Sequence, residues 1–453
     1  MKRPKNAPET RDLLKNIDLS KIDVNAHLEA AIKYNSDYSH WDRVRYRTKE
    51  GLDPKIVWAL MKLMRENCQH IRIGDMKMKY SLIEEFQKAI HDIDIKAPTS
   101  ILSRNGLDGK EMKIYAISSV MEESIASSQI EGAATTTQVA KKMLRENRRP
   151  QNGSEQMIVN NYNAMRLIKN LKDRDLTQEL IFDVHREITK NTIEDRTYEG
   201  RYRDTDNIVI SDRYTGEVFH EPIRSEKIDG TMRALCDYVN DEKVFVHPLI
   251  KGIMIHYLIG YIHPFVDGNG RTARSLFYWY LLKKGYWVIE FMSLSKAIKN
   301  DRQNYDLSYL LSETDENDMT YFIKFNLSKM EEALDDFIGY VENKRKEQHE
   351  FELKISDDLR LPMRQRMIIM RAIRSGAAFS IYEIQSKYQV TYQTARADIM
   401  RLEELGLIEK VGKQSNQVLY SIKNSGRKSD EGSKEKKNAA PPEKVRRLDN
   451  FFG

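Results

Sequence analysis

The strongest constraint on the fold is a long apolar segment that leads without a break into a short polar one. Residues 247–262 are dominated by leucine, isoleucine, methionine and tyrosine, and residues 263–274 read His-Pro-Phe-Val-Asp-Gly-Asn-Gly-Arg-Thr-Ala-Arg. A helix that is apolar on all sides is buried inside a protein. We therefore expect a buried central helix that holds the polar segment at its end.

The polar segment has the residue types of a phosphate-binding turn. Gly268 and Gly270 permit positive φ and a close approach of the backbone to a ligand. Residues 272–278 read as the start of a helix, whose free N–H groups and dipole attract anions. Arg271 and Arg274 are three residues apart and project from nearly the same helical face, and guanidinium groups suit phosphate oxygens.

Two further side chains add chemistry to this turn. Asp267 would repel a bare phosphate, so we expect it to hold a divalent cation that bridges phosphate oxygens. His263 titrates near neutral pH and can take a proton from an incoming hydroxyl. The segment therefore indicates a site for the phosphates of a nucleotide, with a base beside them.

Other interpretations of this segment explain less of it. An ordinary solvated turn would not combine these residue types. The run from Gly268 to Ala273 also fits the G-x-G-x-x-A dinucleotide fingerprint, with Glu290 as its distant acid. That fingerprint needs a buried strand entering the first glycine, whereas Pro264 and Asp267 interrupt the approach. A Walker loop is excluded because no Lys-Ser or Lys-Thr follows a second glycine at the required spacing.

Residues 263–274 resemble the HPFx(D/E)GNGRxxR signature of Fic-domain proteins at every defined position. The resemblance implies transfer of AMP from ATP to a hydroxyl of a target protein. It implies that His263 is the general base, that Asp267 binds Mg²⁺, and that Arg274 binds the γ-phosphate. It assigns the α- and β-phosphates to Gly268, Asn269, Gly270 and Arg271.

A second resemblance lies upstream, at the end of an expected helix whose apolar residues are three or four apart. Ser127, Glu131 and Gly132 fit the (S/T)xxxE(G/N) inhibitory signature of the same family. The resemblance implies that Glu131 pairs with Arg274 and keeps the γ-phosphate out. Its position implies the class whose inhibitory helix precedes the catalytic core in the same chain.

The helical spacing of apolar residues gives way to short β-prone runs at residues 207–221, where we expect a β-hairpin, which we call the flap hairpin. Residues 207–211 and 217–221 are β-prone and flank a run of turn formers. The family resemblance implies that this hairpin covers the site, where a target segment can pair with its exposed edge. Resemblance also suggests Tyr305 as a border of the adenine site, although core packing explains this residue equally well.

The chain is expected to be all-helical apart from the flap hairpin and a C-terminal wing. We expect a helical extension at 1–111, a Fic core at 112–340, a charged linker at 341–360 and a disordered tail at 423–453. Residues 361–422 resemble a winged helix-turn-helix module. Its residues 380–405 are the candidate DNA-binding segment, with Gln393, Arg396 and Arg401 on or near its outer face. A protein partner is an equal alternative, since many winged helices bind protein.

Composition adds broader limits. The net charge of +6 is compatible with nucleic acid or nucleotide binding and diagnostic of neither. Two cysteines without metal-ligand spacing fit a reduced, cytoplasmic setting, and no segment has the length and apolarity of a membrane span. The oligomeric state stays open. Two alternatives to AMP transfer also remain: an ATP-sensing DNA-binding regulator, and a Fic enzyme with another donor or with AMP-removing activity.

Overall fold

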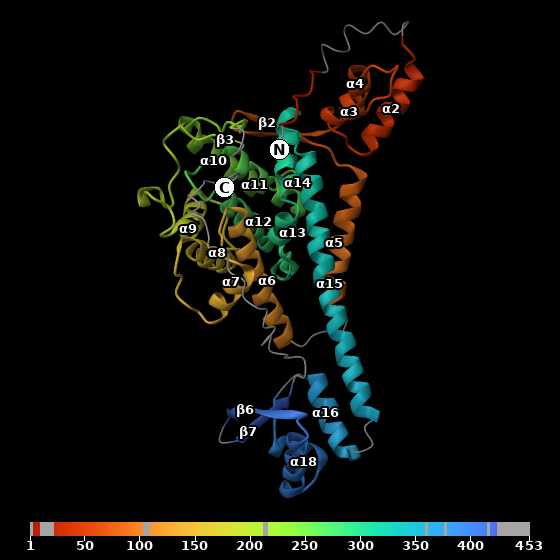
Figure 1. Ribbon diagram of the computed structural model, residues 1–453, viewed down its shortest axis with the longest axis vertical. Coiled ribbons are helices and arrows are strands. Elements are labelled where there is room, and N and C mark those ends of the chain that lie inside the picture. The colour runs from red at the N-terminus through yellow and green to blue at the C-terminus, as the bar shows by residue number, and fades with distance from the viewer. Residues whose placement is uncertain are drawn as a thin grey trace, which may run out of the picture. The chain divides into compact units, whose positions relative to one another are not determined.

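The computed structural model describes residues 3–9, 22–102, 109–211, 216–357, 361–375, 378–414 and 417–423. These residues form mainly helices, with three small antiparallel sheets between them (Figure 1). They divide into two compact units: residues 1–98 with 116–337, and residues 99–115 with 338–447. The mostly helical fold class expected from the sequence is confirmed.

The N-terminal part of the first unit begins with a group of short helices, of which α4 shows why its boundaries fall where they do. Asp53 accepts a hydrogen bond from the backbone N–H of Lys55, and Pro54 is the first helical residue. Such a cap satisfies an unpaired donor, and proline needs no partner at that position. The helices are α2 Val24–Ser36, α3 Trp41–Arg47, α4 Pro54–Met64 and α5 Glu84–Leu102.

A β-hairpin between α4 and α5 corrects the sequence-based expectation. The region 1–111 was expected to be helical, but strands β1 (Gln69–Ile73) and β2 (Met76–Tyr80) pair antiparallel there. Alternating side chains explain the strands, because every second residue faces the protein. Ile73, Met78 and Tyr80 are buried on that face, and Gly74 makes the turn with a φ of 57°.

Two buried helices form the centre of the first unit. Helix α11 (Pro248–Ile262) is buried from Leu249 to Gly260, as expected, and packs along α12 (Asn269–Lys283), which is buried from Asn269 to Leu282. The first unit also contains α7 Thr137–Arg145, α8 Gly153–Asn170, α9 Gln178–Thr189, η2 Arg196–Tyr198, α10 Ser225–Asn240, η3 Trp287–Phe291, α13 Leu294–Asn300 and α14 Arg302–Thr314 (Figure 1). Helix α6 (Gly109–Ile130) belongs to it from residue 116 onward, and α15 (Thr320–Asp357) as far as residue 337.

The flap hairpin is present but shorter than expected. Strand β3 contains Ile210–Ser211 and β4 contains Val218–His220, with Ile210 opposite His220. The expected turn residues 212–215 lie outside the described residues. A ladder this short is marginal by itself, so its position depends on packing against the rest of the unit.

The second unit contains the distal part of α15 and a small core of its own. The expected linker 341–360 is helical as far as Asp357, because its lysine, arginine and glutamate residues favour helix and no glycine or proline interrupts it. Then follow α16 Met363–Ser375, β5 Phe379–Ser380, α17 Ile381–Tyr388, α18 Tyr392–Glu404, β6 Ile408–Gln414 and β7 Gln417–Ile422, with strand order β5-β7-β6.

Capping residues set the starts of two helices in this second unit. Ser380 caps α17 and Thr391 caps α18, each by accepting a backbone N–H in the first turn. Between the two helices, Gln389 takes the left-handed conformation with a φ of 51°. The expected disordered tail lies outside the described residues beyond position 423. In the part of the chain that is described, no helix has both the length and the apolar composition that a membrane crossing requires.

Gly260 tests how closely α11 is packed. A Cβ atom at this position would lie 2.5 Å from the hydroxyl oxygen of Tyr309. Gly260→Ala should therefore lower the free energy of unfolding by about 1–3 kcal/mol, the usual cost of overpacking a filled core. Gly230→Ala in α10 is the matched control, because nothing lies within 4 Å of that Cβ. Urea denaturation of both variants compares them, and equal stability would show that Tyr309 moves aside.

Candidate functional site

The backbone of the polar loop is fixed by contacts within the loop. Helix α11 ends at Ile262, and the next residue, His263, takes a left-handed conformation with φ 50° and ψ 58°. The side chain of Asn269 bridges back to Phe265: its Oδ1 accepts the Phe265 N–H at 2.9 Å, and its Nδ2 donates to the Phe265 carbonyl at 2.8 Å. The Asn269 side chain thus closes the loop, and a phosphate contact through this residue, which stays a prediction, would have to use its backbone N–H.

Gly268 brings the loop against α9 and starts α12. Its φ is 83°, and a Cβ atom there would lie 2.9 Å from Cγ2 of Thr189. Any side chain at this position would therefore be strained and would clash. The first turn of α12, from Asn269 to Arg271, is buried at the end of the loop. The backbone N–H groups and the dipole at such a helix start attract anions.

His263 is held as a neutral imidazole. It is buried, and its Nδ1 donates to the carbonyl oxygen of Gly260 at 3.3 Å, which leaves the lone pair on Nε2. Burial lowers the pKa of the imidazole to about 3, with further lowering from His220 and Arg203 and opposition from Asp267. A neutral imidazole with a free nitrogen can accept a proton at neutral pH.

Asp267, near the end of the loop, and Arg271, in the first turn of α12, form an ion pair. The Arg271 Nη2 donates to the Asp267 Oδ2 at 3.0 Å, and the Gly268 N–H donates to its Oδ1 at 2.6 Å. Burial raises the pKa of the carboxyl, but the Arg271 charge and the Gly268 N–H outweigh burial, so the pKa lies below its ordinary value. Asp267 is therefore ionised and, with its side chain 26% exposed, accessible to a cation.

The donors around Asp267 suit one kind of metal site better than another. Among the described residues there is no group of three His, Cys, Asp or Glu side chains that would hold an ion without further ligands. Mg²⁺ is commonly bound by one or two carboxylates together with substrate phosphates. The single ionised carboxylate of Asp267 could hold Mg²⁺ if a bound substrate supplied further oxygen ligands.

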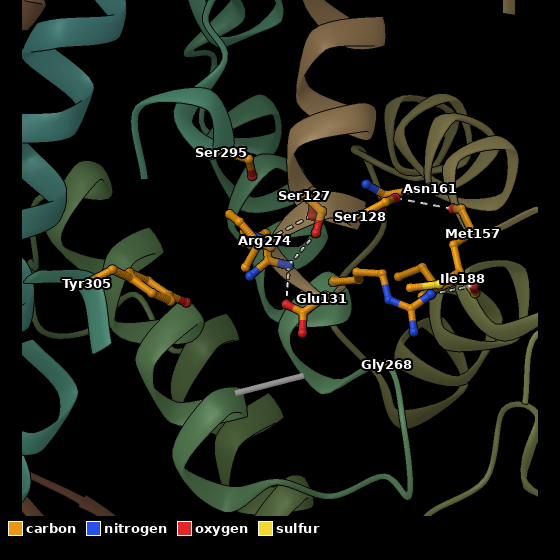
Figure 2. A network of polar contacts seen from close by, with 12 residues as sticks. Ser127, Ser128, Glu131, Met157, Asn161, Ile188, Gly268, Arg274, Ser295 and Tyr305 are labelled. Atoms are coloured by element: carbon orange, nitrogen blue, oxygen red, sulfur yellow. Dashed lines mark hydrogen bonds and ion pairs between the residues drawn. The ribbon is translucent and has the colours of Figure 1, made fainter. Parts of the chain in front are cut away.

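Arg274 joins the loop to the end of α6. Its Nε donates to the Ser127 Oγ at 2.8 Å, and its Nη2 donates to the Ser127 carbonyl at 3.1 Å and to the Glu131 Oε1 at 2.5 Å (Figure 2). Burial lowers the pKa of the guanidinium, but the Glu131 charge outweighs burial and keeps the pKa above its ordinary value. In the described structure, the Arg274 Nη1 and the Glu131 Oε2 are buried without hydrogen-bond partners.

Helix α6 is capped at its end and is held to the core further back. It ends at Ile130; Gly132 follows with a φ of 95°, which suits glycine, and the Ala133 N–H caps the helix by donating to the Ser128 carbonyl at 3.0 Å. Eight residues before Glu131, the buried Glu123 accepts the Tyr278 hydroxyl at 2.9 Å and the Ser295 N–H at 2.8 Å. Burial raises the pKa of the Glu123 carboxyl, against the Ser295 and Tyr278 hydrogen bonds.

Tyr305 lies in the core behind the ion pair. It is 2% exposed, and its hydroxyl contacts the His256 Nε2 at 2.9 Å within a cluster of aromatic rings. Its ring points toward Arg274 and Glu131 (Figure 2). This position supports the core-packing interpretation, and contact between Tyr305 and a nucleotide stays a prediction.

His185 is a positioning residue that the sequence analysis did not assign to the site. Its ring stacks on Phe265 with centroids 3.7 Å apart, its Nδ1 accepts the Gly200 N–H at 3.0 Å, and its Nε2 donates to the Asp267 carbonyl at 2.8 Å. Burial lowers the pKa of His185 to about 4, so the ring is neutral. Its place on the apolar face of an amphipathic helix was the available signal for burial, but no spacing pointed to its partners.

Comparison with known proteins agrees with this geometry. Residues 175–281 match the Fic/DOC family, a range that includes His185 and the whole polar loop. Protein adenylyltransferase Fic from Nematostella vectensis is 28% identical over 169 residues, which are 37% of this chain and 35% of the relative. Protein adenylyltransferase fic-1 from Caenorhabditis elegans is 32% identical over 107 residues, which are 23% of this chain and 19% of the relative. The matches thus span about a third or less of the curated relatives.

Solved structures share the fold over a longer stretch. A Fic family protein from Desulfovibrio desulfuricans has a TM-score of 0.50 at 18% identity, covering 77% of this chain and 98% of that one. Fic-1 from C. elegans has a TM-score of 0.50 at 16% identity, covering 69% of this chain and 84% of that one. At these identities the likeness establishes a common fold.

The neutral state of His185 predicts a pH dependence of stability. Between pH 6.5 and about 4 the unfolded chain binds a proton that the folded chain does not bind at His185, so stability falls as the pH is lowered. His185→Gln should therefore flatten the dependence of the unfolding free energy on pH in this window, by up to about 1.4 kcal/mol per pH unit. Denaturant unfolding from pH 4 to pH 7 measures the slope. His70→Gln, at an exposed position in β1, is the control, and an unchanged slope in His185→Gln would contradict the assignment.

Proposed function

We propose that the chain is a protein adenylyltransferase that transfers AMP from ATP to a Ser, Thr or Tyr hydroxyl of a protein. The observation that carries the proposal is the neutral, buried His263 at the start of the short loop that leads into the N-terminus of α12, which bears Arg271 and Arg274. The match to the Fic/DOC family and the names of the curated relatives support the same activity.

In this proposal, the phosphates of ATP lie along the start of α12. The N–H groups of Gly268, Asn269 and Gly270 and the Arg271 side chain receive the α- and β-phosphates, and Arg274 receives the γ-phosphate. The buried Nη1 of Arg274 and Nε of Arg271, which lack partners among the described residues, supply donors for this purpose. Arginine side chains suit phosphate because their N–H groups fork toward two oxygens.

The reaction follows from the placement of His263. Its Nε2 takes the proton of the target hydroxyl, whose oxygen forms a bond to the α-phosphorus. The bond between the α-phosphorus and its bridging oxygen breaks, and pyrophosphate leaves with the electron pair. The positive groups of the α12 turn stabilise the negative charge that develops on the leaving group. Asp267 would hold Mg²⁺, which would supply further positive charge to the phosphates.

The resting state is proposed to be inhibited by Glu131. Its carboxylate occupies the Arg274 guanidinium and adds negative charge where the γ-phosphate would bind. ATP then binds weakly, or with its α-phosphorus displaced from the line of attack. Ser127 contributes to the inhibition because its hydroxyl accepts a hydrogen bond from the same guanidinium and orients it, and Gly132, with its positive φ, turns the chain just after the helix.

Target proteins are proposed to dock on the flap hairpin. A target segment would extend the short ladder of β3 and β4 by main-chain hydrogen bonds, which demand little sequence identity from the target. Such pairing would bring a hydroxyl beside His263.

Transfer and inhibition are tested together by self-labelling with ATP that carries the radioactive atom at the α-phosphate. Glu131→Gly should incorporate label at least about tenfold faster than wild type, since a coupling of about 1.4 kcal/mol at the γ-phosphate already gives that factor. Glu131→Gly combined with His263→Ala should incorporate none, because no base remains. Scintillation counting of the precipitated protein measures the label.

Binding of ATP to each variant is the control for this experiment. Bound ATP without label in Glu131→Gly would contradict adenylyl transfer and favour an ATP sensor. Label from another α-labelled nucleotide in preference to ATP would change the donor. Loss of label from a modified protein on incubation with wild type would instead favour AMP removal with Glu131 orienting water.

We also propose that the second unit is a winged helix-turn-helix module that binds DNA. The supporting observation is the outer face of α18, where Gln393 and Arg396 are exposed on adjacent turns, with Lys413 exposed on β6. Arg401 contributes less, because it pairs with Glu404 at 3.3 Å. In helix-turn-helix proteins the second helix of the pair reads the major groove.

DNA binding is tested by fluorescence anisotropy with a labelled random-sequence duplex at two salt concentrations. Binding should weaken as salt rises, and Arg396→Ala should weaken binding and lower the salt slope by about one unit if Arg396 contacts a phosphate. Lys88→Ala, at an exposed position of α5 outside this unit, is the control for loss of one charge. No binding at low salt would leave a protein partner as the role of this module, whereas ATP-dependent binding without any self-label would favour a regulator.

A further inference from the structure

A buried arginine outside the polar loop links His263 to the segment that carries the flap hairpin. Arg203 is 3% exposed and lies between η2 and β3. Its Nε donates to the His263 carbonyl at 2.9 Å, and its own N–H donates to the Pro264 carbonyl at 2.9 Å. These contacts hold the carbonyl groups of His263, which takes the left-handed conformation, and of Pro264, in addition to the contacts within the loop.

The same guanidinium holds both ends of the flap hairpin. Its Nη1 donates to the Thr205 carbonyl at 2.7 Å, on the way into the hairpin, and its Nη2 donates to the Ile223 carbonyl, on the way out. Asp206 adds to these contacts where the two ends of the hairpin meet. It pairs with the Arg203 Nη1 at 3.3 Å, and its carboxylate accepts a hydrogen bond of 2.6 Å from the N–H of Ser225 at the start of α10. One side chain therefore fixes three carbonyl groups from two separate parts of the chain.

We infer that Arg203 is a positioning residue for the transfer reaction, which sets the flap hairpin at a fixed distance from His263. This inference rests on the proposed function. A target segment paired with the hairpin places its hydroxyl relative to the hairpin backbone, so the hydroxyl meets Nε2 of His263 only if hairpin and histidine keep their spacing. The β3–β4 ladder is too short to supply that spacing itself.

Other contacts also hold the hairpin, and they limit what Arg203 does. His220 in β4 contacts the Tyr261 carbonyl at 2.7 Å and pairs with Glu313 in α14 at 3.1 Å, and Phe219 is fully buried. These contacts attach one strand to α11 and α14. Arg203 differs because it bonds to the catalytic histidine itself, so its removal should loosen the hairpin relative to His263 without detaching β4.

The charge of Arg203 gives a second, separable readout. The charged and titratable groups that face His263 are His220 on β4, Arg203, and Asp267 in the loop itself. Lysine at position 203 would keep a cation near His263 but lose the forked contacts with the three carbonyls. Glutamine would lose the cation as well. The transfer rate falls at low pH when His263 becomes protonated. Because the cation holds the pKa of His263 down, this fall should occur at higher pH in Arg203→Gln than in Arg203→Lys.

The experiment uses the full chain with Glu131→Gly, so that the proposed inhibition does not mask the effect. Arg203→Lys should lower the initial rate of self-labelling at saturating ATP by about tenfold or more, since a displacement of about 1 Å can cost about a hundredfold. The dissociation constant of ATP should stay within about twofold, because the α12 turn is untouched. Arg201→Lys is the matched control: it lies two positions away, is exposed, and pairs with Asp204.

Hydrogen exchange gives a measure that does not depend on activity. The amides of residues 207–211 and 216–221 should exchange faster in Arg203→Lys than in Arg201→Lys, while those of residues 249–260 in α11 stay unchanged. Equal exchange and equal labelling rates in the two variants would overturn the inference, as would a fall in ATP affinity that matches the fall in rate. No label in Glu131→Gly itself would overturn the proposed transfer, and exchange would still decide whether Arg203 fixes the hairpin.

Discussion

The buried ion pair of Arg274 and Glu131 is the contact on which the arrangement of the site depends. Removing two charges from water costs several kcal/mol for each ion, and their attraction offsets this only when hydrogen bonds satisfy the remaining donors and acceptors. Ser127 supplies two such bonds, yet one nitrogen of Arg274 and one oxygen of Glu131 stay unpaired among the described residues. The guanidinium is thus satisfied in part, and a phosphate would satisfy it in the same way as the carboxylate.

Neutral groups hold the backbone around this pair, and the charged groups stay available for a ligand. The amide of Asn269 closes the loop, and the neutral ring of His185 fixes the Asp267 carbonyl. Neither contact changes the net charge of the site. Arg203 is the exception, because it uses a buried cation to hold backbone carbonyls, and that cation also lowers the pKa of His263.

The residues of the site could be predicted where a local signal existed. The apolar run before His263 predicted the buried α11, and the short motifs predicted that Glu131 and Arg274 would meet, which they do at 2.5 Å. Arg203 and His185 gave no such signal, since most of their hydrogen-bond partners are backbone atoms, which carry no sequence signature, and those that link them to the loop at 263–267 lie 60 or more residues away. The hairpin at 69–80 was missed although its side chains alternate, because the surrounding helices set the expectation for the whole region.

Glu123 has a consequence for how quickly the site can open. Its bonds to Tyr278 and Ser295 hold α6 eight residues before Glu131, so under the proposed inhibition the helix would stay attached when the Glu131 carboxylate leaves Arg274. Freeing Arg274 then needs only rotation of the Glu131 side chain or fraying of one helical turn. Both motions are far faster than local unfolding, which takes microseconds to seconds. If Glu131 inhibits as proposed, its release would therefore follow changes in ATP concentration without a slow conformational step.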